Sequence, residues 1–594
     1  MLAYLEHANL FVVPLDEDRG WYRYHHLFAD VLRWRMRQEY PDLLPALHRR
    51  ASGWFEREGL LTEAIHHALA ARDWARAIRL IESSGMTVVL DQQVQTVLGW
   101  IGELPEELVR ERPDLCTIRA LALVFFKRPD AAEASLQQAE RCLRGSPTTD
   151  EARAILGRAA VIRAVIARYS GNLERCVAMA RRALELLPET ETTARERAGA
   201  TINAALAYEV SGDVTSAKER PLEEAIASFH ASGALIPQLI SITFLARMRT
   251  LQGKLRAAVA TYEEAAALMS RRNKLPDVGG NSAAYYIGLG EIYREWNDLD
   301  AAERCLKHGR DFFIGTLMVD ANVVAHVYLS LARLQQARGQ GAAARATLEE
   351  FANLARQHDI FPLLLARGEA AQARLALMQG DLLAAVSWAE ASELGPDDKT
   401  NYPCEELYLT LVRILIAQGR LDSMGSSLVD ALDLLDRLFS AAEAGGRMGS
   451  VIEILALRAL ALWARHESGE ALAALERSLI LAEPEGYIRV YVDEGRPMAA
   501  LLSELSEMRR RGPPDLHRHA VLGYVRRLLA AFESPHTSIV PPHSGGYAPK
   551  IDQPLPEHLT AREGGTCADR RGSLQQGDSS PALHRGRHRQ GVRP

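Results

Sequence analysis

The chain has 594 residues, a formal net charge of −6, and 47% hydrophobic and 25% charged residues. This length allows roughly three or four domains, and the composition excludes a chain that is disordered throughout or that binds polyanions through its overall charge. No run approaches the roughly 20 apolar residues of a membrane span, no signal peptide opens the chain, and the six cysteines lack the spacing of a disulfide scaffold. We therefore expect a cytoplasmic protein with reduced thiols and no membrane partner.

The first 45 residues combine a short apolar stretch with an aromatic and basic block. The stretch LFVVPL (residues 10–15) predicts a strand, and DEDRG after it predicts a turn. Residues 21–40 mix aromatic side chains with arginines, a combination that suits either stacking on nucleic acid or packing against a neighbouring domain. We favour the packing face, because the chain as a whole is acidic. Residues 46–83 return to helical periodicity.

A turn of the form Gly-polar-apolar, once with Asn in place of Gly, recurs at successive spacings of 41, 41, 44, 42, 41 and 39 residues. Amphipathic helical segments flank the turns, and small residues after them permit close approach between helices. Because one helix pair cannot bury its apolar faces alone, we expect the pairs to stack into a solenoid similar to tetratricopeptide repeats. A generic helical bundle with accidental glycine spacing is the less favoured alternative. The turns are Gly171-Asn172-Leu173, Gly212-Asp213-Val214, Gly253-Lys254-Leu255, Asn297-Asp298-Leu299, Gly339-Gln340-Gly341, Gly380-Asp381-Leu382 and Gly419-Arg420-Leu421, and the small pairs are Ala257-Ala258, Ala301-Ala302, Ala343-Ala344 and Ala384-Ala385.

No pattern of catalytic, cofactor-binding or metal-binding residues stands out. No GxxxxGK(S/T) phosphate loop is present, and Gly288-Leu289-Gly290 is a fragment of a glycine-rich loop that we assign to packing. The doublets His25-His26 and His66-His67 lack the i,i+4 spacing of a helical zinc pair, so we expect structural or surface histidines. We therefore predict no enzyme activity for this chain. The carboxylates interpreted as helix starts and solvated faces are Glu103, Glu106 and Glu107.

Three blocks together resemble the large ATP-binding LuxR-type transcriptional regulators that include the maltose-regulon activator. The first covers residues 8–33 and the helical segments that follow, the second is the repeat array, and the third joins residues 476–502, with EPEGY at 483–487, to LTARE at 559–563. The resemblance implies a nucleotide-binding module, a winged-helix arm, a superhelix that receives an inducer, and a C-terminal helix-turn-helix. ATP would bind only the nucleotide module, which we place before Met1, so no cofactor is expected here.

The C-terminus changes character at Gly564. LTARE predicts a helix entry, with Thr560 as the cap and Glu563 three residues later, but no helical pattern follows. Back-translated and read one nucleotide later, the tail permits SNKEIA and TVK, which are typical of the family's helix-turn-helix. We therefore expect a frame change near Gly564, and a tail that attracts phosphate weakly without reading bases. The residues that remain of the DNA-binding motif are Leu559, Thr560, Arg562 and Glu563.

The sequence thus predicts an all-α fold: a tetratricopeptide-like helical-hairpin superhelix with a small N-terminal winged-helix remnant and a disordered C-terminal tail. We expect the signal-sensing and protein-interaction region of a LuxR-family regulator, with a small-molecule or protein inducer on the superhelix, self-association, and specific DNA binding lost. The alternative is a stand-alone tetratricopeptide scaffold that binds peptides or partner proteins, and a helical-repeat enzyme is least favoured. The expected parts are the winged-helix remnant (1–45), a helical connector (46–115), the superhelix (116–533), a linker (534–558) and the disrupted helix-turn-helix (559–594).

Overall fold

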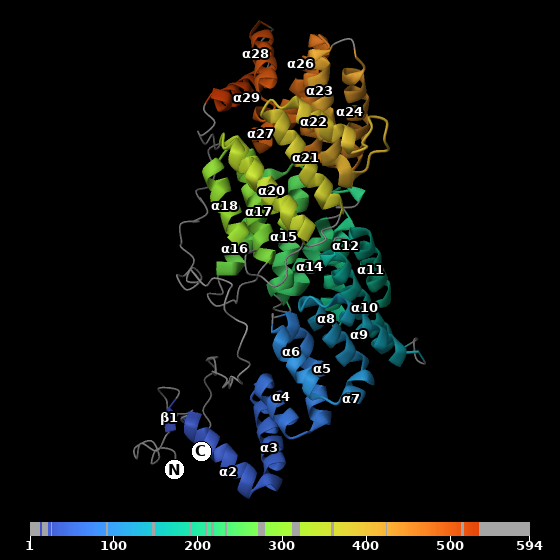
Figure 1. The fold of residues 1–594 in the computed structure, drawn as a ribbon, viewed down its shortest axis with the longest axis vertical. Coiled ribbons are helices and arrows are strands. Elements are labelled where there is room, and N and C mark those ends of the chain that lie inside the picture. Colours follow the sequence, from blue (N-terminus) through green and yellow to red (C-terminus); the bar gives the residue numbers. More distant parts are fainter. Residues whose placement is uncertain are drawn as a thin grey trace. The chain divides into compact units, whose positions relative to one another are not determined.

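Helices make up nearly all of the chain that the computed structural model describes (Figure 1). The described residues lie in one unit within residues 1–541. The expected linker and disrupted helix-turn-helix, including Leu559, Thr560, Arg562 and Glu563, lie outside them. The described residues are 12–14, 22–24, 26–90, 93–144, 149–170, 172–190, 193–207, 211–215, 219–231, 235–270, 280–311, 321–357, 362–422, 425–511 and 516–533.

The N-terminal part holds a two-stranded antiparallel sheet followed by a helix. Strand β1 (Val12–Pro14) pairs with β2 (Tyr22–Tyr24), and Val13 lies opposite Arg23. β1 confirms the strand predicted from LFVVPL, whereas the predicted turn between the strands lies outside the described residues. Helix α2 (His26–Glu39) contains most of the aromatic and basic block.

The remaining elements are short 3-10 helices and α-helices in pairs. The 3-10 helices are η1 (Pro41–Leu43), η4 (Tyr402–Cys404) and η5 (Glu483–Glu485). The α-helices are α3 (Leu44–Arg57), α4 (Leu61–Ala70), α5 (Trp74–Leu90), α6 (Val94–Glu103), α7 (Glu106–Arg110), α8 (Pro113–Phe125), α9 (Pro129–Cys142), α10 (Asp150–Tyr169), α11 (Leu173–Leu186), α12 (Ala194–Ala205), α14 (Glu219–Ala231), α15 (Leu235–Leu251), α16 (Leu255–Ser270), α17 (Gly280–Glu295), α18 (Leu299–Asp311), α19 (Ala321–Ala337), α20 (Gly341–Gln357), α21 (Pro362–Met378), α22 (Leu382–Ala391), α23 (Glu405–Leu421), α24 (Ser427–Ala444), α25 (Met448–Ala464), α26 (Ser468–Ala482), α27 (Arg489–Val492), α28 (Arg496–Arg511) and α29 (Leu516–Glu533).

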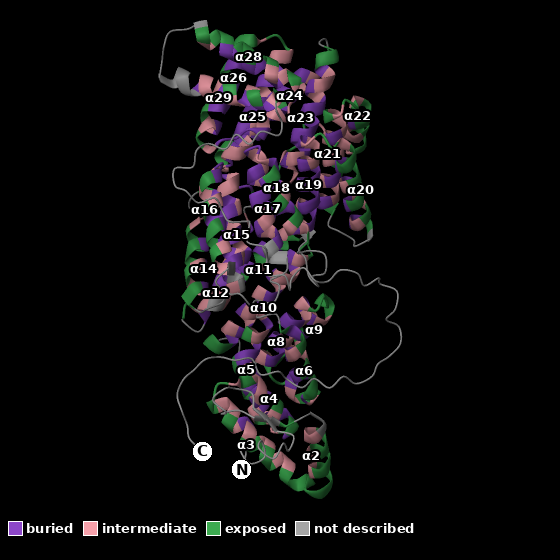
Figure 2. Ribbon diagram, turned by 90° about the vertical axis from the view of Figure 1, so that its left-hand side faces the viewer, coloured by how far each residue is buried: buried purple, intermediate pink, exposed green. Residues whose placement is uncertain are grey.

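The helix pairs stack as the repeat pattern predicts. Each first helix of a hairpin contacts its own second helix and also the first helix of the next hairpin, so that α15, α17, α19, α21, α23 and α25 form a continuous row. This arrangement buries apolar faces that a single hairpin would leave in water. In Figure 2 the buried residues run along the middle of these helices and the exposed ones lie on their outer faces. The predicted all-α, tetratricopeptide-like superhelix is confirmed.

Left-handed backbone at the turns explains the recurring glycine. A residue at positive φ ends the first helix and lets the chain reverse, and glycine adopts this conformation without steric cost. Gly171 lies outside the described residues. The predicted turn residues with positive φ are Gly212 (69°), Gly253 (79°), Asn297 (61°), Gly339 (74°) and Gly380 (86°).

The seventh predicted turn, at Gly419, is wrong. Gly419 is buried inside α23, which continues to Leu421. A Cβ atom at Gly419 would overlap with the side chain of Leu428 in α24, so this glycine permits close approach of two helices. The next left-handed glycine is Gly446, with a φ of 72°, after α24.

The small residues after the turns fill the contact between the helices of a hairpin. The second alanine of each predicted pair has an exposed fraction of 0%. No larger side chain would fit without moving a neighbouring helix, since protein interiors are close-packed. These four residues are Ala258, Ala302, Ala344 and Ala385.

Among the described residues no helix is both long and apolar enough to cross a membrane. The cysteines that the structure describes carry free thiols, and Cys116, Cys176 and Cys305 are buried.

Candidate functional site

The segment of residues 483–495, which contains EPEGY, runs from α26 to α28. Gly486 and Gly495 have φ values of 78° and 70°, so the chain reverses at both ends of the segment. Between them Tyr487, Ile488 and Tyr491 are buried. The segment is therefore an internal element of the fold, and the hydrogen bonds of its backbone identify what it packs against.

The 483–495 segment is held by repeats that lie roughly two hundred residues earlier in the chain. The indole Nε1 of Trp296 donates to the carbonyl oxygen of Glu485 at 2.8 Å. The backbone N–H of Ile488 donates to the carbonyl of Glu295 at 3.0 Å, and that of Val490 donates to the Glu295 carboxylate at 2.8 Å. The last turn of α17 is thus bonded directly to the segment.

A second contact between distant repeats lies next to this one. The backbone N–H of Val214 donates to the carbonyl of Gly445 at 2.8 Å, and Arg447 donates to the carbonyl of Gly212 at 2.6 Å. Arg447 also donates to Glu405 at 2.7 Å, with both side chains buried. The turn before α25 therefore docks on the turn that follows α12.

Buried charges complete the contact between α17 and the 483–495 segment. Arg294 of α17 lies 2.8 Å from the Asp493 carboxylate, and Arg489 pairs with the same carboxylate while donating to Asn297 at 3.2 Å. Burial opposes ionisation of Asp493, but the guanidinium groups of Arg489 and Arg294 outweigh it and lower the pKa of Asp493 to about 2. Asp493 is therefore ionised at neutral pH and links the segment to α17.

A row of arginines extends from this contact along the first helices of successive hairpins. Arg333 of α19, Arg374 of α21 and Arg413 of α23 occupy equivalent positions, 41 and 39 residues apart. We call these three residues the arginine row. Burial, followed by the charges of Arg374 and Arg294, lowers the pKa of Arg333 to about 10, and burial together with Arg413 lowers the pKa of Arg374. Three guanidinium groups are thus close enough inside the stack to affect one another's pKa.

The carboxylates near the arginine row pair unequally with its members. Arg413 lies 2.6 Å from both Glu453 of α25 and Glu494, whereas Arg374 lies 3.9 Å and 3.7 Å from the same two groups. Burial opposes ionisation of Glu453, but Arg413 and Arg374 outweigh it and lower the pKa of Glu453 to about 2. Arg333 forms an ion pair with Glu406.

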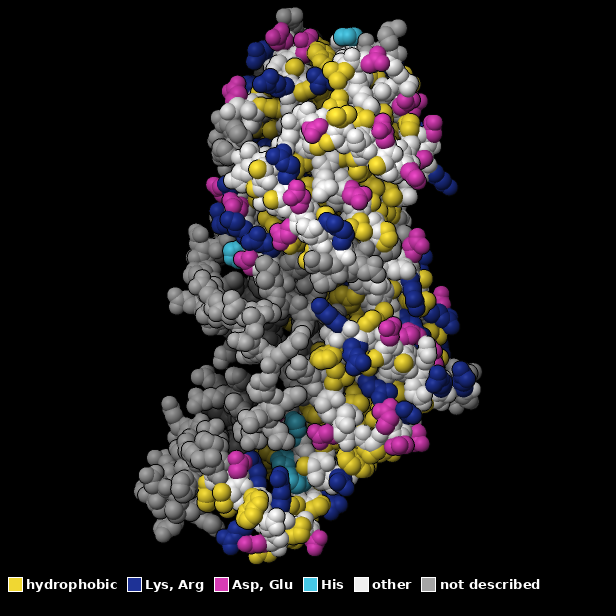
Figure 3. Space-filling model, viewed as in Figure 1, with side chains coloured by type: hydrophobic (Ala, Val, Ile, Leu, Met, Phe, Trp, Pro, Cys, Tyr) yellow, Lys and Arg dark blue, Asp and Glu magenta, His cyan; other side chains and the backbone are white. Residues whose placement is uncertain are grey.

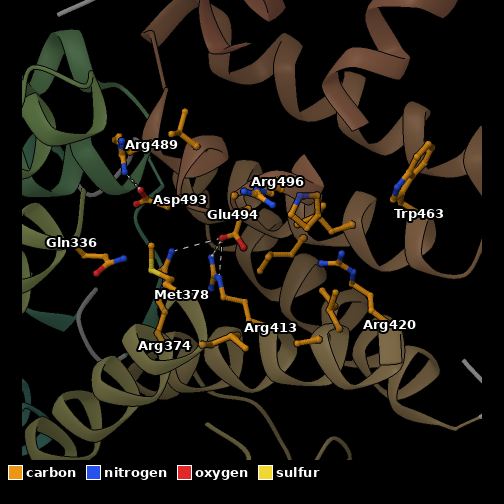
Figure 4. A pocket seen from close by; sticks show the side chains of 18 residues that line it. Gln336, Arg374, Met378, Arg413, Arg420, Trp463, Arg489, Asp493, Glu494 and Arg496 are labelled. Atoms are coloured by element: carbon orange, nitrogen blue, oxygen red, sulfur yellow. Dashed lines mark hydrogen bonds and ion pairs between the residues drawn. The ribbon is translucent and has the colours of Figure 1, made fainter. Parts of the chain in front are cut away.

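A cavity of about 490 Å³ lies beside the arginine row, between α21, α23, α25 and the end of the 483–495 segment. Figure 4 shows Arg374, Arg413 and Arg496 around Glu494, with Arg420 and Trp463 to one side. Five of the lining residues are arginines and two are acidic. The lining residues are Gln336, Arg374, Leu377, Met378, Arg413, Ile416, Ala417, Arg420, Leu457, Leu460, Trp463, Arg489, Val492, Asp493, Glu494, Gly495, Arg496 and Pro497.

The histidines and glycines considered from the sequence have structural or surface positions where the structure describes them. His66 is exposed, and His25 lies outside the described residues. His67 of α4 lies 2.8 Å from His48 of α3, and burial lowers the pKa of both imidazoles. Cβ atoms at Gly288 and Gly290 would overlap with Tyr262 and Leu306, which agrees with the packing role that we assigned to these glycines. Among the described residues no group of three or more His, Cys, Asp or Glu side chains is placed to hold a metal ion.

Two of the three carboxylates interpreted as helix starts take that position. Glu106 and Glu107 lie in the first turn of α7. Glu103 is the last residue of α6 and is exposed, so it lies on a solvated face but does not start a helix. Pro105 is the N-cap residue of α7 and lies two residues after Glu103, where α6 ends.

The arginine row was missed in the sequence, although a signal for it is present. Arg333, Arg374 and Arg413 each lie six residues before a glycine of the repeat pattern. A charged residue recurring in register on the otherwise apolar first helix of a hairpin indicates a shared interior position, because equivalent positions stack in a solenoid.

The stacked hairpins and the interior cavity define a tetratricopeptide-like superhelical protein. Comparison with known families gives two matches: the MalT winged helix domain matches residues 1–44 and the MalT-like TPR region matches residues 157–508. Since the second match covers more than half of the chain, the chain belongs to the MalT-like TPR region family. The resemblance stated from the sequence is confirmed.

Two kinds of curated relative match this chain, a transcriptional regulator over most of its length and a kinase over a smaller part. The chain is 26% identical over 538 residues to the HTH-type transcriptional regulator MalT of Yersinia pestis (strain Pestoides F), covering 87% of this chain and 55% of that protein. It is 35% identical over 176 residues to the serine/threonine-protein kinase PknK of Mycobacterium tuberculosis (strain CDC 1551 / Oshkosh), covering 30% of this chain and 16% of the kinase. The chain thus spans about half the length of the MalT relatives and a smaller part of the kinase.

Among solved structures, a human IFIT1 dimer with PPP-AAAA matches with a TM-score of 0.35 and 13% identity, covering 76% of this chain and 93% of that one. The APC/C hetero-tetramer Cut9-Hcn1 matches with a TM-score of 0.31 and 12% identity, covering 84% and 99%.

Proposed function

We propose that this chain is the signal-sensing and protein-interaction region of a LuxR-type transcriptional regulator. The observation that carries the proposal is the cavity beside the 483–495 segment, because a ligand there contacts α21, α23 and a segment that is bonded to α17. A ligand that binds more tightly to one arrangement of these elements shifts the population toward it. The family match supports this role and names no inducer.

The proposal also covers the binding partners of the chain and the loss of specific DNA binding. An inducer, a small molecule or a protein, binds the superhelix, and its effect is transmitted through self-association or docking of another protein. No residue of this chain is proposed to bind ATP. Specific DNA binding is lost, because only Leu559, Thr560, Arg562 and Glu563 retain the helix-turn-helix pattern. The tail after them has too few large aliphatic residues for a core, namely Leu574, Leu583 and Val592.

Sensing is tested by thermal unfolding of the 594-residue chain against a library of small metabolites. A ligand that binds only the folded state raises the melting temperature with concentration. We expect at least one metabolite to do so, and to slow hydrogen exchange in residues 483–495. In Ala417→Phe, which fills the cavity, the effect should disappear, whereas Ala384→Phe, on the exposed side of α22, should keep it. Equal stabilisation of both variants would contradict a sensing role for this cavity.

The loss of DNA readout is tested by fluorescence anisotropy with duplex DNA of varied sequence. We expect weak binding that weakens steeply with salt and does not discriminate between duplexes. A sequence-specific complex that persists at physiological salt would show that the tail retains a functional reading domain.

A further inference from the structure

We infer that the cavity beside the arginine row binds a small organic anion, with a carboxylate or phosphate group and an apolar body. This inference rests on the proposed sensing function and adds the chemical class of the ligand. It is carried by the charge balance of the lining, by the placement of its polar and apolar walls, and by the helix that begins at its edge.

The carboxylates at the cavity are already engaged by other groups. Asp493 pairs with Arg294 and Arg489. Glu494 accepts two hydrogen bonds from Arg413, at 2.9 and 2.6 Å. The remaining cations of the lining therefore have little negative charge left to pair with, although charges inside a protein are costly unless they are compensated.

Three arginines of the lining supply the positive charge that a ligand would meet. The ion pairs of Arg374, at 3.7 and 3.9 Å, are longer than charge-assisted hydrogen bonds of about 2.7–2.9 Å. Arg420 and Arg496 are exposed at the cavity, and within the described part of the chain neither forms an ion pair. A bound anion would form the short contacts that these guanidinium groups lack.

The start of α28 adds to the same potential. Gly495, Arg496 and Pro497 line the cavity and form the entry to α28, whose first turn contains no acidic residue. The N-terminus of a helix carries partial positive charge. In α28 this partial charge is what an anion would meet, because Pro497 has no N–H and the N–H groups of Met498 and Ala499 donate to the carbonyl of Gly495. An anion in the cavity would lie near this end of α28 and near the arginine row.

An apolar wall faces the cavity as well. Leu457, Leu460 and Trp463 of α25 form part of the lining, together with Leu377 and Met378 of α21. A volume of about 490 Å³ falls within the roughly 300–1,000 Å³ of small-molecule sites. It admits a molecule with one charged group and a compact apolar body, and it is too small for a polymer.

The concentration of arginine in the cavity differs from the face of the protein that Figure 3 shows. On the face shown in Figure 3, basic and acidic side chains are interspersed over the described residues without a large area of one sign. The lining of the cavity, with five arginines and two acidic residues, differs from this face, and such a local excess of positive charge attracts a small anion.

The test measures thermal unfolding of the full chain with three matched probes. Phenyl phosphate and phenylacetate carry the two kinds of anionic group on a similar apolar body, and 2-phenylethanol is the neutral control. We expect one or both anions at millimolar concentration to raise the melting temperature, with no effect of the alcohol. The anion that acts at lower concentration identifies the phosphate or the carboxylate as the preferred group.

Two variants assign the effect to the cavity. Because Arg420 and Arg496 are exposed, Arg420→Gln and Arg496→Gln should fold normally, and each should raise the dissociation constant of the active anion about tenfold by removing a charge-assisted contact. Arg181→Gln, at an exposed position of α11 outside the cavity, should leave the dissociation constant unchanged.

The outcomes separate this inference from the proposed function. Binding of the alcohol as tightly as the anions, unaffected by Arg420→Gln and Arg496→Gln, would overturn the anion inference and leave a neutral ligand for the sensing site. If the anions stabilise the Arg181→Gln variant and the two cavity variants equally, the anions do not bind in this cavity. If no probe acts while metabolites of the library stabilise the chain through the cavity, the inducer is not of this class and the inference fails.

Discussion

Removal of Arg413 should destabilise the interior more than removal of any surface arginine. Its side chain is 6% exposed and lies 2.6 Å from both Glu453 and Glu494. In Arg413→Met the partly buried carboxylates of Glu453 and Glu494, 27% and 10% exposed, lose their nearest cation. Breaking a fully buried ion pair from one side costs about 3–5 kcal/mol, and we expect a loss at the lower end of this range. The matched control is Arg477→Met, because Arg477 and Glu443 form a pair at 3.1 Å with side chains 55% and 53% exposed, a kind of pair worth about 0–1 kcal/mol.

The assay is native-state hydrogen exchange of peptides from α23 and α25 in the full chain, which reports local opening without assuming two-state unfolding of the whole protein. A loss of 3 kcal/mol should accelerate exchange in these helices by roughly 150-fold, and Arg477→Met by less than about fivefold. Adding Glu494→Gln to Arg413→Met should restore part of the protection, since one uncompensated carboxylate is then removed. Equal exchange in the two single variants would refute the conclusion that the buried charges hold α23 to α25.

Three further outcomes follow from the contacts described above. Gly368→Ala should lower the melting temperature, because the new Cβ would lie 2.7 Å from a phenyl carbon of α20 and overpacking costs about 1–3 kcal/mol. Gly469→Ala has no atom within 4 Å of its new Cβ and should raise the melting temperature slightly, so the reverse order of the two variants would contradict the packing. The pKa values of Asp493 and Glu453 are about 2 in the folded chain, against ordinary values of 3.8 and 4.5. The two carboxylates therefore contribute stability that is present above pH 4.5 and is lost as pH falls toward 2. Urea unfolding should show lower stability at about pH 3 than at about pH 6, and Asp493→Asn should reduce this difference. Asn297→Gly should be milder than Asn297→Ala, because both lose a side-chain hydrogen bond but only alanine is strained at a φ of 61°; equal melting temperatures would mean that the turn carries no strain.

The helical superhelix could be predicted from the sequence because each repeat contains the residues that its turn and its helix contact require. A turn residue that adopts positive φ at Gly253 or Gly380, and an alanine such as Ala258 or Ala385 shortly after it, are local requirements that the sequence displays directly. Gly419 was misassigned because it follows the previous repeat glycine at the usual distance. In the sequence alone, a glycine that permits close approach of two helices cannot be told from one that forms a left-handed turn. Burial, which only the packed structure defines, distinguishes the two.

The candidate site was less accessible to sequence reasoning. Arg374 and Arg413 lie in register in the repeats, so their sharing of an interior row could have been found by aligning the hairpins. Their partners could not, because Glu494 and Asp493 come from a segment whose docking on α17 depends on how far the stack of hairpins curves. That curvature accumulates from small rotations at each repeat and has no local signature. The expectations for residues 534–594 remain predictions.

The hydrogen bonds of residues 483–495 with α17 also change how this array should unfold. A solenoid in which each repeat touches only its neighbours has purely local energetics, so that terminal repeats fray one after another and the rest persists. Here the bonds from Ile488 and Val490 to Glu295 join positions roughly two hundred residues apart. The first and last repeats of this stretch are therefore bonded to each other as well as to their neighbours, so that opening one interface disturbs the others. The stretch from α17 to α27 should therefore gain and lose its structure as one cooperative unit. It should also fold slowly, because the loop must close before its bonds stabilise it.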